Sequence, residues 1–329
     1  MKKLIALVLM SVLIITLAAC KPGTDANADV PASGTEQADK ISVVATIFPP
    51  YDFTREVAGD YAEITMLLPP AAESHSFEPS QQDIIKIQNC DVFIYVGGES
   101  DEWVERVLAS LDTSNMEIIT LMDCVDVVEE EVVEGMEDEE EEEAEESEGG
   151  EEEPELDEHV WTSPRNAKLI TEKISNVLQS VDAENSAVYA ENTAAYLSKL
   201  DELDAKFQDV VDNAARKTFV FGDRFPFRYF ADAYGLDYYA AFPGCSTETE
   251  ASAATIAFLI DKVNEEQIPV VFHIELANTK IADAIAEQSG AKVLELHACH
   301  NISKSDFEAG ETYLSIMTRN VDALREALA

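Results

Sequence analysis

The histidines are the residues of this chain whose type and placement best suit chemistry. The 329 residues include five of them, His75, His159, His273, His297 and His300. A neutral imidazole is the commonest protein ligand for zinc, and with help from carboxylates it also binds manganese and other divalent ions. His273 lies inside an apolar strand pattern, which is typical of a buried structural residue. The other four lie at or just beyond the ends of predicted elements, and they predict a metal site.

The loops that carry these four histidines belong to both halves of the chain. His75 lies in a turn-rich segment before a helix, and His159 lies where a run of acidic residues ends. His297 and His300 follow the final predicted strand, in the sequence His-Ala-Cys-His. Loops at such ends face a cleft in open α/β sheets. The spread of the imidazoles therefore favours a site assembled between two lobes.

Strand and helix patterns alternate along both halves. We predict strands at residues 41–47, 63–68, 92–96, 117–121, 218–221, 237–241, 270–274 and 292–296. Helical patterns lie among them, at residues 51–57, 81–88, 102–111, 166–181, 227–234, 251–265, 280–288 and 309–328. This alternation indicates an α/β fold in which helices cover both faces of parallel sheets.

A long helix is predicted between the two halves, at residues 184–214. Apolar side chains recur there at helical spacing, at Tyr189, Tyr196, Leu200, Leu203, Phe207 and Val210. At 1.5 Å per residue this helix would be about 45 Å long, more than one small lobe needs. We therefore predict a helix that bridges an N-terminal α/β lobe, residues 41–183, and a C-terminal α/β lobe, residues 215–329.

The N-terminus has the pattern of a bacterial export signal. Two lysines precede an apolar run that is too short for a comfortable membrane span, which predicts a signal peptide at residues 1–19. The sequence Leu-Ala-Ala-Cys ending at Cys20 resembles a lipobox, in which Cys20 is lipidated and becomes the mature N-terminus. An uncleaved anchor and a plain secretory signal are the alternatives. Residues 20–40 are then a flexible tether, and the protein is expected on the outer face of the cell membrane.

Export makes disulfide bonds permissible for the cysteines that remain. Cys90, Cys124, Cys245 and Cys299 are an even number in such a compartment. Cys245 and Cys299 both lie in the second half, so a disulfide bond between them is one hypothesis. Free buried thiols are the other.

The charge of the chain is strongly acidic and unevenly distributed. Its 66 acidic and 22 basic residues give a formal net charge of −44, which would repel phosphate backbones and excludes nucleic-acid binding. Residues 129–158 hold 20 acidic and no basic residues, as expected of a disordered, self-repelling loop. This acidic loop either collects cations for a nearby site or is a solvating linker without a defined role.

An ordered series of motifs covers nearly all of the mature chain. They lie at residues 46–53, 58–60, 75–80, 91–98, 159–167, 229–236 and 313–320. This series resembles the zinc- and manganese-type metal receptors of ABC importers, the cluster A-I family of solute-binding proteins. The resemblance implies two (β/α)4 lobes with parallel sheets, a long bridging helix, and a metal site in the cleft between the lobes.

The resemblance also implies a set of metal ligands. Two ligand motifs of the family match at His75 and His159. The register of the third ligand falls on Arg224, and a guanidinium cannot ligate a cation. Asp223 could replace that ligand after a shift of one residue, or Arg224 could pair with a nearby carboxylate.

The fourth ligand register of the family falls on His297, and His300 is a second candidate three residues on. We interpret the pattern as a ligand that has moved, with His300 or Asp223 replacing the group that is missing at Arg224. Glu275 is a candidate to orient one of the imidazoles from outside the coordination sphere. Three histidines and one further donor suit tetrahedral zinc, whereas a set richer in oxygen would favour manganese.

The function implied is that of a high-affinity receptor for a divalent metal ion, without enzymatic activity. The receptor would be a lipid-anchored monomer that delivers zinc to an ABC permease and its ATPase. A manganese receptor of the same family is the nearest alternative. A lipid-anchored, adhesin-like surface protein and an exported metal hydrolase are further alternatives, although no HExxH-like motif or nucleophile arrangement occurs in the sequence.

Overall fold

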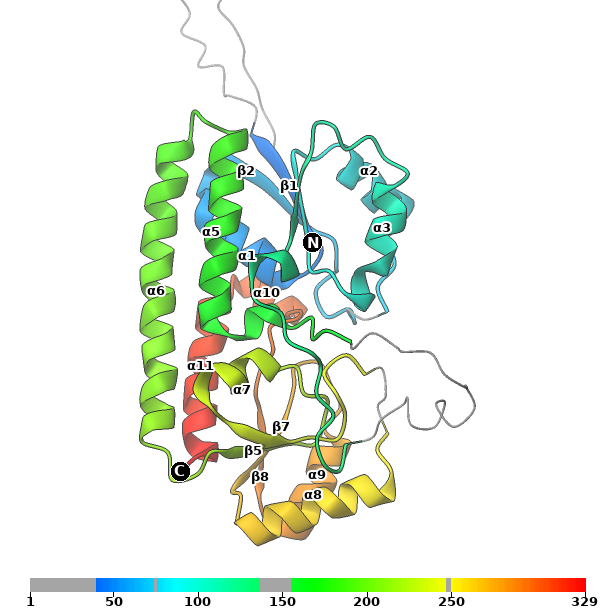
Figure 1. Cartoon of the computed structure of the whole chain (residues 1–329), viewed down its shortest axis with the longest axis vertical. Helices are drawn as coiled ribbons and strands as arrows, with labels where there is room; N and C mark the ends of the chain where they lie inside the picture. Colours follow the sequence, from blue (N-terminus) through cyan, green and yellow to red (C-terminus); the bar gives the residue numbers. More distant parts are fainter. Residues whose placement is uncertain (1–39, 74–75, 137–154, 247–249) are drawn as a thin grey trace, which may run out of the picture. The chain divides into compact units, whose positions relative to one another are not determined.

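The computed structural model describes residues 40–73, 76–136, 155–246 and 250–329 (Figure 1). The predicted signal peptide, the lipidation site Cys20 and nearly all of the tether lie outside these ranges. His75 and residues 137–154 of the acidic loop also lie outside them.

The first lobe is built on a parallel sheet of four strands in the order β2-β1-β3-β4. The strands are β1 (Ile41–Ala45), β2 (Ala62–Met66), β3 (Val92–Tyr95) and β4 (Glu117–Thr120). Its helices are α1 (Phe48–Ala58), α2 (Gln81–Gln88), α3 (Glu102–Leu108) and α5 (Pro164–Val181). Short 3-10 turns lie at Gly59–Tyr61, Glu99–Asp101, Met122–Cys124 and Val160–Thr162.

The second lobe repeats this topology, with strand order β6-β5-β7-β8. Its strands are β5 (Thr218–Phe221), β6 (Asp237–Tyr239), β7 (Val270–His273) and β8 (Lys292–Glu295). Its helices are α7 (Arg228–Tyr234), α8 (Ala253–Glu266), α9 (Lys280–Ser289), α10 (Lys304–Ala309) and α11 (Tyr313–Ala327). The predicted fold class, two parallel α/β sheets in one chain, is confirmed.

The long helix α6 (Ser186–Asp212) packs against both lobes. It contacts α1 and α5 of the first lobe and α7 and α11 of the second, and Figure 1 shows it running along α5 and α11. All six apolar residues of the predicted stripe are buried. The stripe is therefore the surface by which the bridging helix holds the two lobes.

The C-terminal helix predicted at residues 309–328 is found as α11, but it begins four residues later, at Tyr313, and a separate short helix, α10, precedes it. Gly310 ends α10 in the left-handed conformation, with φ 76°, which glycine adopts without strain. The Thr312 side chain then accepts a hydrogen bond from Ser315 N and starts α11. The predicted start at residue 309 was wrong because it joined the end of α10 to the start of α11.

None of the helices in the described ranges has the length and apolar character needed to cross a membrane.

In each sheet, the two central strands end beside the loops that carry the predicted site residues. Thr46 follows β1 and Val96 follows β3, and these two strands are neighbours at the point where the strand order reverses. Arg224 and Ile274 follow the corresponding strands β5 and β7. In sheets of this kind, ligands bind beyond the carboxyl ends of the strands at such a point.

Candidate metal centre

His159 is fully buried and is held by a carboxylate two residues before it. Asp157 Oδ1 lies 3.0 Å from His159 Nδ1 and also accepts a hydrogen bond of 2.8 Å from the backbone N–H of His159. With Nδ1 bonded to a carboxylate, Nε2 is the nitrogen whose lone pair can face a metal ion.

The electrostatic surroundings of His159 are acidic. Burial acts against the imidazolium, but the charges of Asp157, Glu158 and Glu130 outweigh it and raise the pKa of His159. Burial also raises the pKa of the Glu158 carboxyl, which accepts a hydrogen bond of 2.8 Å from Ser100 N. The site is therefore an environment that stabilises positive charge.

The second lobe packs closely against the His159 ring at Gly244. A Cβ atom placed on Gly244 would lie 3.0 Å from His159 Cε1 and 3.1 Å from Nδ1. That position would also lie 2.9 Å from Phe225 O, so a side chain at residue 244 would require the His159 ring or the backbone of Phe225 to shift.

His300 meets His159 from the other lobe. The two ring centroids lie 4.5 Å apart at an angle of 86°, and the Trp161 ring lies 4.8 Å from His300. Trp161 Nε1 donates a hydrogen bond of 2.7 Å to Ala298 O, which joins the two segments that carry the histidines. The structure thus brings together two predicted ligands that are 141 positions apart in the sequence.

The loop that carries His300, residues 297–303, is bonded to the first lobe. Ala71 N donates to Ile302 O over 2.9 Å, and Asn301 Nδ2 donates to both Pro69 O and Ala72 O over 2.8 Å. These bonds fix a loop of the second lobe on the face of the first.

Glu275 holds the same loop from the second lobe. Its two carboxylate oxygens accept hydrogen bonds from the N–H groups of Ala298, over 2.6 Å, and His300, over 2.8 Å. Cys299, between them, has a positive φ of 63°, a conformation that is uncommon for a residue with a side chain. Glu275 therefore positions the backbone of His300, and its suggested role in orienting an imidazole stays a prediction.

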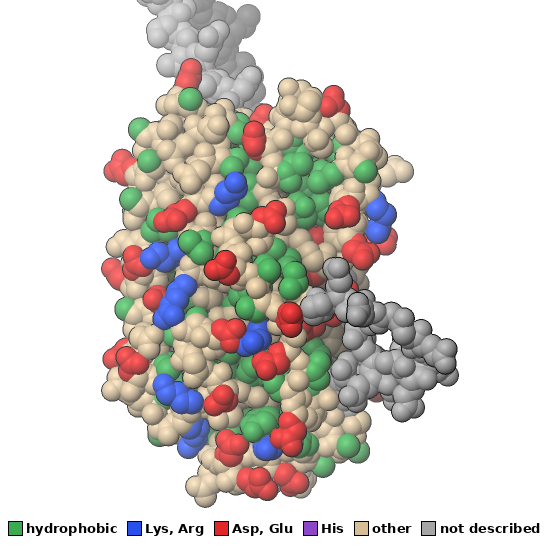
Figure 2. Space-filling view, viewed as in Figure 1, with side chains coloured by type: hydrophobic (Ala, Val, Ile, Leu, Met, Phe, Trp, Pro, Cys, Tyr) green, Lys and Arg blue, Asp and Glu red, His purple; other side chains and the backbone are tan. Residues whose placement is uncertain are grey.

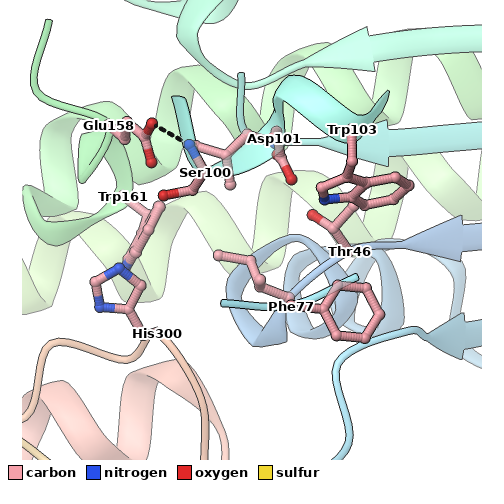
Figure 3. A pocket seen from close by; sticks show the side chains of 10 residues that line it. Thr46, Phe77, Ser100, Asp101, Trp103, Glu158, Trp161 and His300 are labelled. Carbon is pink, nitrogen blue, oxygen red and sulfur yellow. Dashed lines mark hydrogen bonds between the residues drawn. The ribbon is translucent and has the colours of Figure 1, made fainter. Parts of the chain in front are cut away.

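Two cavities flank His300, each with a volume of about 20 Å³, enough for a water molecule. Figure 3 shows the first, with His300 and Trp161 at one end and Phe77 and Trp103 at the other. Thr46, Ile47, Val96, Ser100, Asp101 and Glu158 complete its lining. The second is lined by Ala72, Glu73, Arg224, Ile274, Glu275, Leu276 and Asn301. His300 is shared by both, so it lies between the strand ends of the two lobes.

His297 faces a different environment from His300. Its side chain is buried, its Nδ1 accepts a hydrogen bond of 3.0 Å from Cys299 N, and Glu275 Oε2 lies 3.5 Å away. Asn320 bonds to both its backbone N–H and its carbonyl oxygen. Among the described residues, the ring contacts of His159 involve Trp161 and His300 rather than His297.

The candidates around the third ligand register have other partners. The Asp223 carboxylate accepts hydrogen bonds from Arg224 N, over 2.9 Å, and Ile274 N, over 3.1 Å, and its burial raises its pKa. Arg224 Nη1 lies 3.5 Å from Glu73 Oε1. Arg224 therefore has a carboxylate partner, and the ligand role suggested for Asp223 stays a prediction.

The Cys245–Cys299 disulfide bond suggested by the sequence is absent, since both residues are free thiols. Cys299 is fully buried within the 297–303 loop, and Cys245 lies beside Glu130. The even number of cysteines was therefore a misleading guide to pairing.

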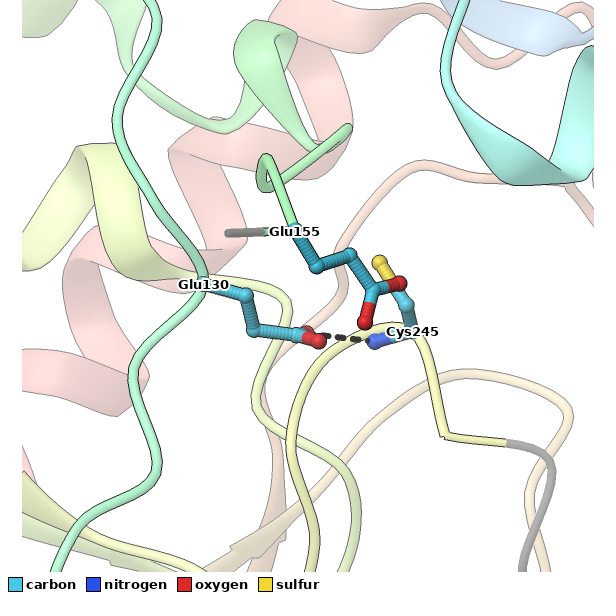
Figure 4. A group of neighbouring side chains, drawn as sticks. All are labelled: Glu130, Glu155 and Cys245. Carbon is cyan, nitrogen blue, oxygen red and sulfur yellow. Dashed lines mark hydrogen bonds between the residues drawn. The ribbon is translucent and has the colours of Figure 1, made fainter. Parts of the chain in front are cut away.

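A group of donors that the sequence did not indicate lies beside His159. Glu130, Glu155 and Cys245 present oxygen and sulfur atoms that all lie within 4.8 Å of one another (Figure 4). Cys245 N donates a hydrogen bond of 2.8 Å to Glu130 Oε1. Only the fold reveals this group, because more than a hundred positions separate Glu130 from Cys245.

Comparison with known proteins agrees with this geometry. Residues 43–327 match the ZnuA family, described as the periplasmic component A of a zinc-uptake complex. The chain is 31% identical over 339 residues to the high-affinity zinc uptake system protein ZnuA of Bacillus subtilis, which covers 99% of this chain and 98% of that protein. It is 33% identical to the zinc-binding lipoprotein AdcA of Streptococcus pneumoniae, but spans only 61% of the length of that protein.

The solved structures include a close neighbour in fold. The Zn(II)-bound ZnuA-like domain of Streptococcus pneumoniae AdcA superposes with a TM-score of 0.71 at 30% identity, over 88% of this chain and 99% of that domain. The fold, the share of the chain covered and the ordered motifs all match the same family. This chain belongs to the ZnuA family of solute-binding receptors.

Proposed function

We propose that this protein is an extracytoplasmic receptor that binds zinc between its two lobes and delivers it to an ABC-type permease. The observation that carries the proposal is the pair of imidazoles, His159 and His300, that meet with 4.5 Å between ring centroids where the two lobes join. Relatives named as zinc-uptake and zinc-binding proteins support the same ion.

The donor set favours zinc over manganese. The two donors that meet at the ring pair are imidazole groups, and the carboxylates of Asp223 and Glu275 are both engaged by backbone N–H groups. Nitrogen-rich, tetrahedral sites suit zinc, whereas manganese prefers oxygen. We assign His75 as a third ligand from its motif alone, since it lies outside the described residues. The ligand role suggested for His297 stays a prediction.

The place and partners of the receptor follow from the sequence pattern and the family. Lipidation at Cys20 would hold the protein at the outer face of the membrane, and a permease with its ATPase would receive the ion. We propose a monomer that carries out no reaction. Acidic side chains are spread over the face shown in Figure 2, as suits a protein that attracts cations.

A zinc titration of four proteins tests the binding proposal. The native protein should bind one zinc ion tightly, with a change in the fluorescence of Trp161, and should bind manganese more weakly. His159→Ala and His300→Ala should each lower zinc affinity by at least about 100-fold, because even the loss of an outer-sphere partner costs 10–100-fold.

His273→Ala is the matched control for these variants. The His273 ring is bonded to Ile274 O and lies on strand β7, so this variant should bind zinc as the native protein does. Native-level affinity in both His159→Ala and His300→Ala would refute the site. Tight zinc binding that is lost equally in all three variants would show that it depends on general stability.

A further inference from the structure

A tyrosine of the second lobe is bonded to the segment that carries His159. Tyr229, in the first turn of α7, is buried and donates a hydrogen bond of 2.7 Å to Asp157 O. Its oxygen also accepts a hydrogen bond of 3.3 Å from Val128 N. Asp157 N donates to Val128 O over 3.0 Å, so one hydroxyl holds two neighbouring segments at both ends of the acidic loop.

The same aspartate is the residue that holds the His159 ring. The backbone of Asp157 is held by Tyr229 and Val128. Its carboxylate is buried and is hydrogen-bonded to the backbone N–H and to the ring Nδ1 of His159. Because backbone and side chain belong to one residue, the position of the Tyr229 hydroxyl determines where the carboxylate lies. The orientation of the imidazole follows from the carboxylate.

We propose that Tyr229 and Asp157 are positioning residues for His159, and that through them the second lobe orients a metal ligand of the first. The inference rests on the proposed function, since it assigns a role at the same zinc site. A ligand whose ring is held in advance loses less freedom when the ion binds. Zinc affinity therefore depends on the contact between α7 and the segment before His159, in addition to the ligands themselves.

The chain offers a matched control on the same helix. Tyr234 is as buried as Tyr229, at 5% exposure, and its hydroxyl also donates a hydrogen bond of 2.7 Å to an aspartate. That aspartate is Asp204 on α6, away from the histidines. Tyr234→Phe removes the same group from the same helix without touching the proposed relay.

The experiment compares Tyr229→Phe, Tyr234→Phe and Asp157→Asn with the native protein, using zinc alone as the probe. Asp157→Asn should weaken zinc binding about 10–100-fold. Tyr229→Phe should weaken it about fivefold through faster release, the factor that one ordinary hydrogen bond provides. Tyr234→Phe should retain native affinity. In ¹⁵N spectra of the zinc-free native protein, the His159 ring should carry its proton on Nδ1, and both relay variants should reduce that preference.

The outcomes separate this inference from the proposed function. A native protein that fails to bind zinc overturns the function and, with it, the inference. If the native protein binds zinc and both relay variants match it in affinity and in the His159 spectrum, the inference fails and the function stands. Equal weakening by Tyr229→Phe and Tyr234→Phe would overturn the inference as well, because the cause would then be a loosened α7.

Discussion

At the scale of single residues, the site depends on carboxylates that orient other groups. Asp157 holds the His159 ring, Glu275 holds the backbone of His300, and Asp223 holds the strand ends beside Arg224. Each of these three acids is buried and accepts N–H donors. A buried carboxylate must accept hydrogen bonds in this way or become protonated. These three acids are therefore held in place by the fold, and they are poor candidates for a ligand that has to move onto a metal ion.

Asp52, on α1, gives a prediction about pH. Its carboxylate accepts a hydrogen bond of 2.7 Å from Tyr313 N at the start of α11, and burial raises its pKa from 3.8 to about 6 although Arg55 opposes the rise. The folded state thus holds this proton more tightly than the unfolded state does. The stabilisation is complete below about pH 4 and is lost as the pH rises to about 6, which corresponds to about 3 kcal/mol.

Urea unfolding of the native protein and of Asp52→Asn from pH 4 to pH 8 measures this effect. The variant cannot titrate at this position, so the native protein should lose free energy of unfolding relative to it between pH 4 and pH 6. A difference between the two proteins that stays constant across this range would contradict the raised pKa.

At the scale of elements, the alternating strands and helices that occur in both lobes could be predicted from the sequence. All the predicted strands are found, and the central strands β1, β3, β5 and β7 are the most buried and appear as short apolar runs, as expected of a parallel sheet covered on both faces. The predicted C-terminal helix began too early and α10 was not predicted, because the evidence for the boundary, Gly310 and the cap Thr312, is local.

The site could be predicted in type but only partly in geometry. The residue types and the loops identified His159 and His300 as candidates, and the structure places their rings together. The different surroundings of His297 and His300 could not be predicted, because they depend on a turn at Cys299 that has a positive φ. The roles of Asp157 and Tyr229 depend on hydrogen bonds between distant segments, which no local pattern records.

The cap of α11 gives a prediction at this scale. Thr312→Ala removes the hydrogen bond to Ser315 N and should lower the free energy of unfolding by about 1 kcal/mol, because a side-chain cap contributes that much to a helix. Thr312→Ser keeps the hydroxyl and should restore most of the loss in the same denaturation experiment. If both variants were equally unstable, the lost methyl group would be the cause, and the cap would not.

At the scale of the whole molecule, charge and site act on the same cations. The formal net charge of −44 attracts divalent ions. The range of this attraction falls as the salt concentration rises, because the Debye length is about 8 Å at physiological ionic strength. The two ends of the acidic loop contact the second lobe through Val128, which directly precedes the loop, and through Glu130 and Asp157. A change confined to residues 137–154 therefore leaves these contacts in place.

Replacing residues 137–154 with an uncharged Gly-Ser segment of equal length tests the loop as a cation collector. Zinc association at low ionic strength should slow, whereas the release rate set by the histidines should stay the same. Stopped-flow fluorescence at several salt concentrations measures both rates. Association that is as fast as in the native protein at every salt concentration would leave the loop as a solvating linker.

The 297–303 loop has a consequence for how the chain folds. It leaves strand β8 of the second lobe, yet Ile302 and Asn301 are bonded to the backbone of residues 69–72 in the first. The first lobe is thus completed by a segment made at the far end of the chain, and α6 links the lobes on another side. Neither lobe has a finished surface alone, so a chain that emerges from its N-terminus cannot complete its first lobe until nearly all of the second has emerged.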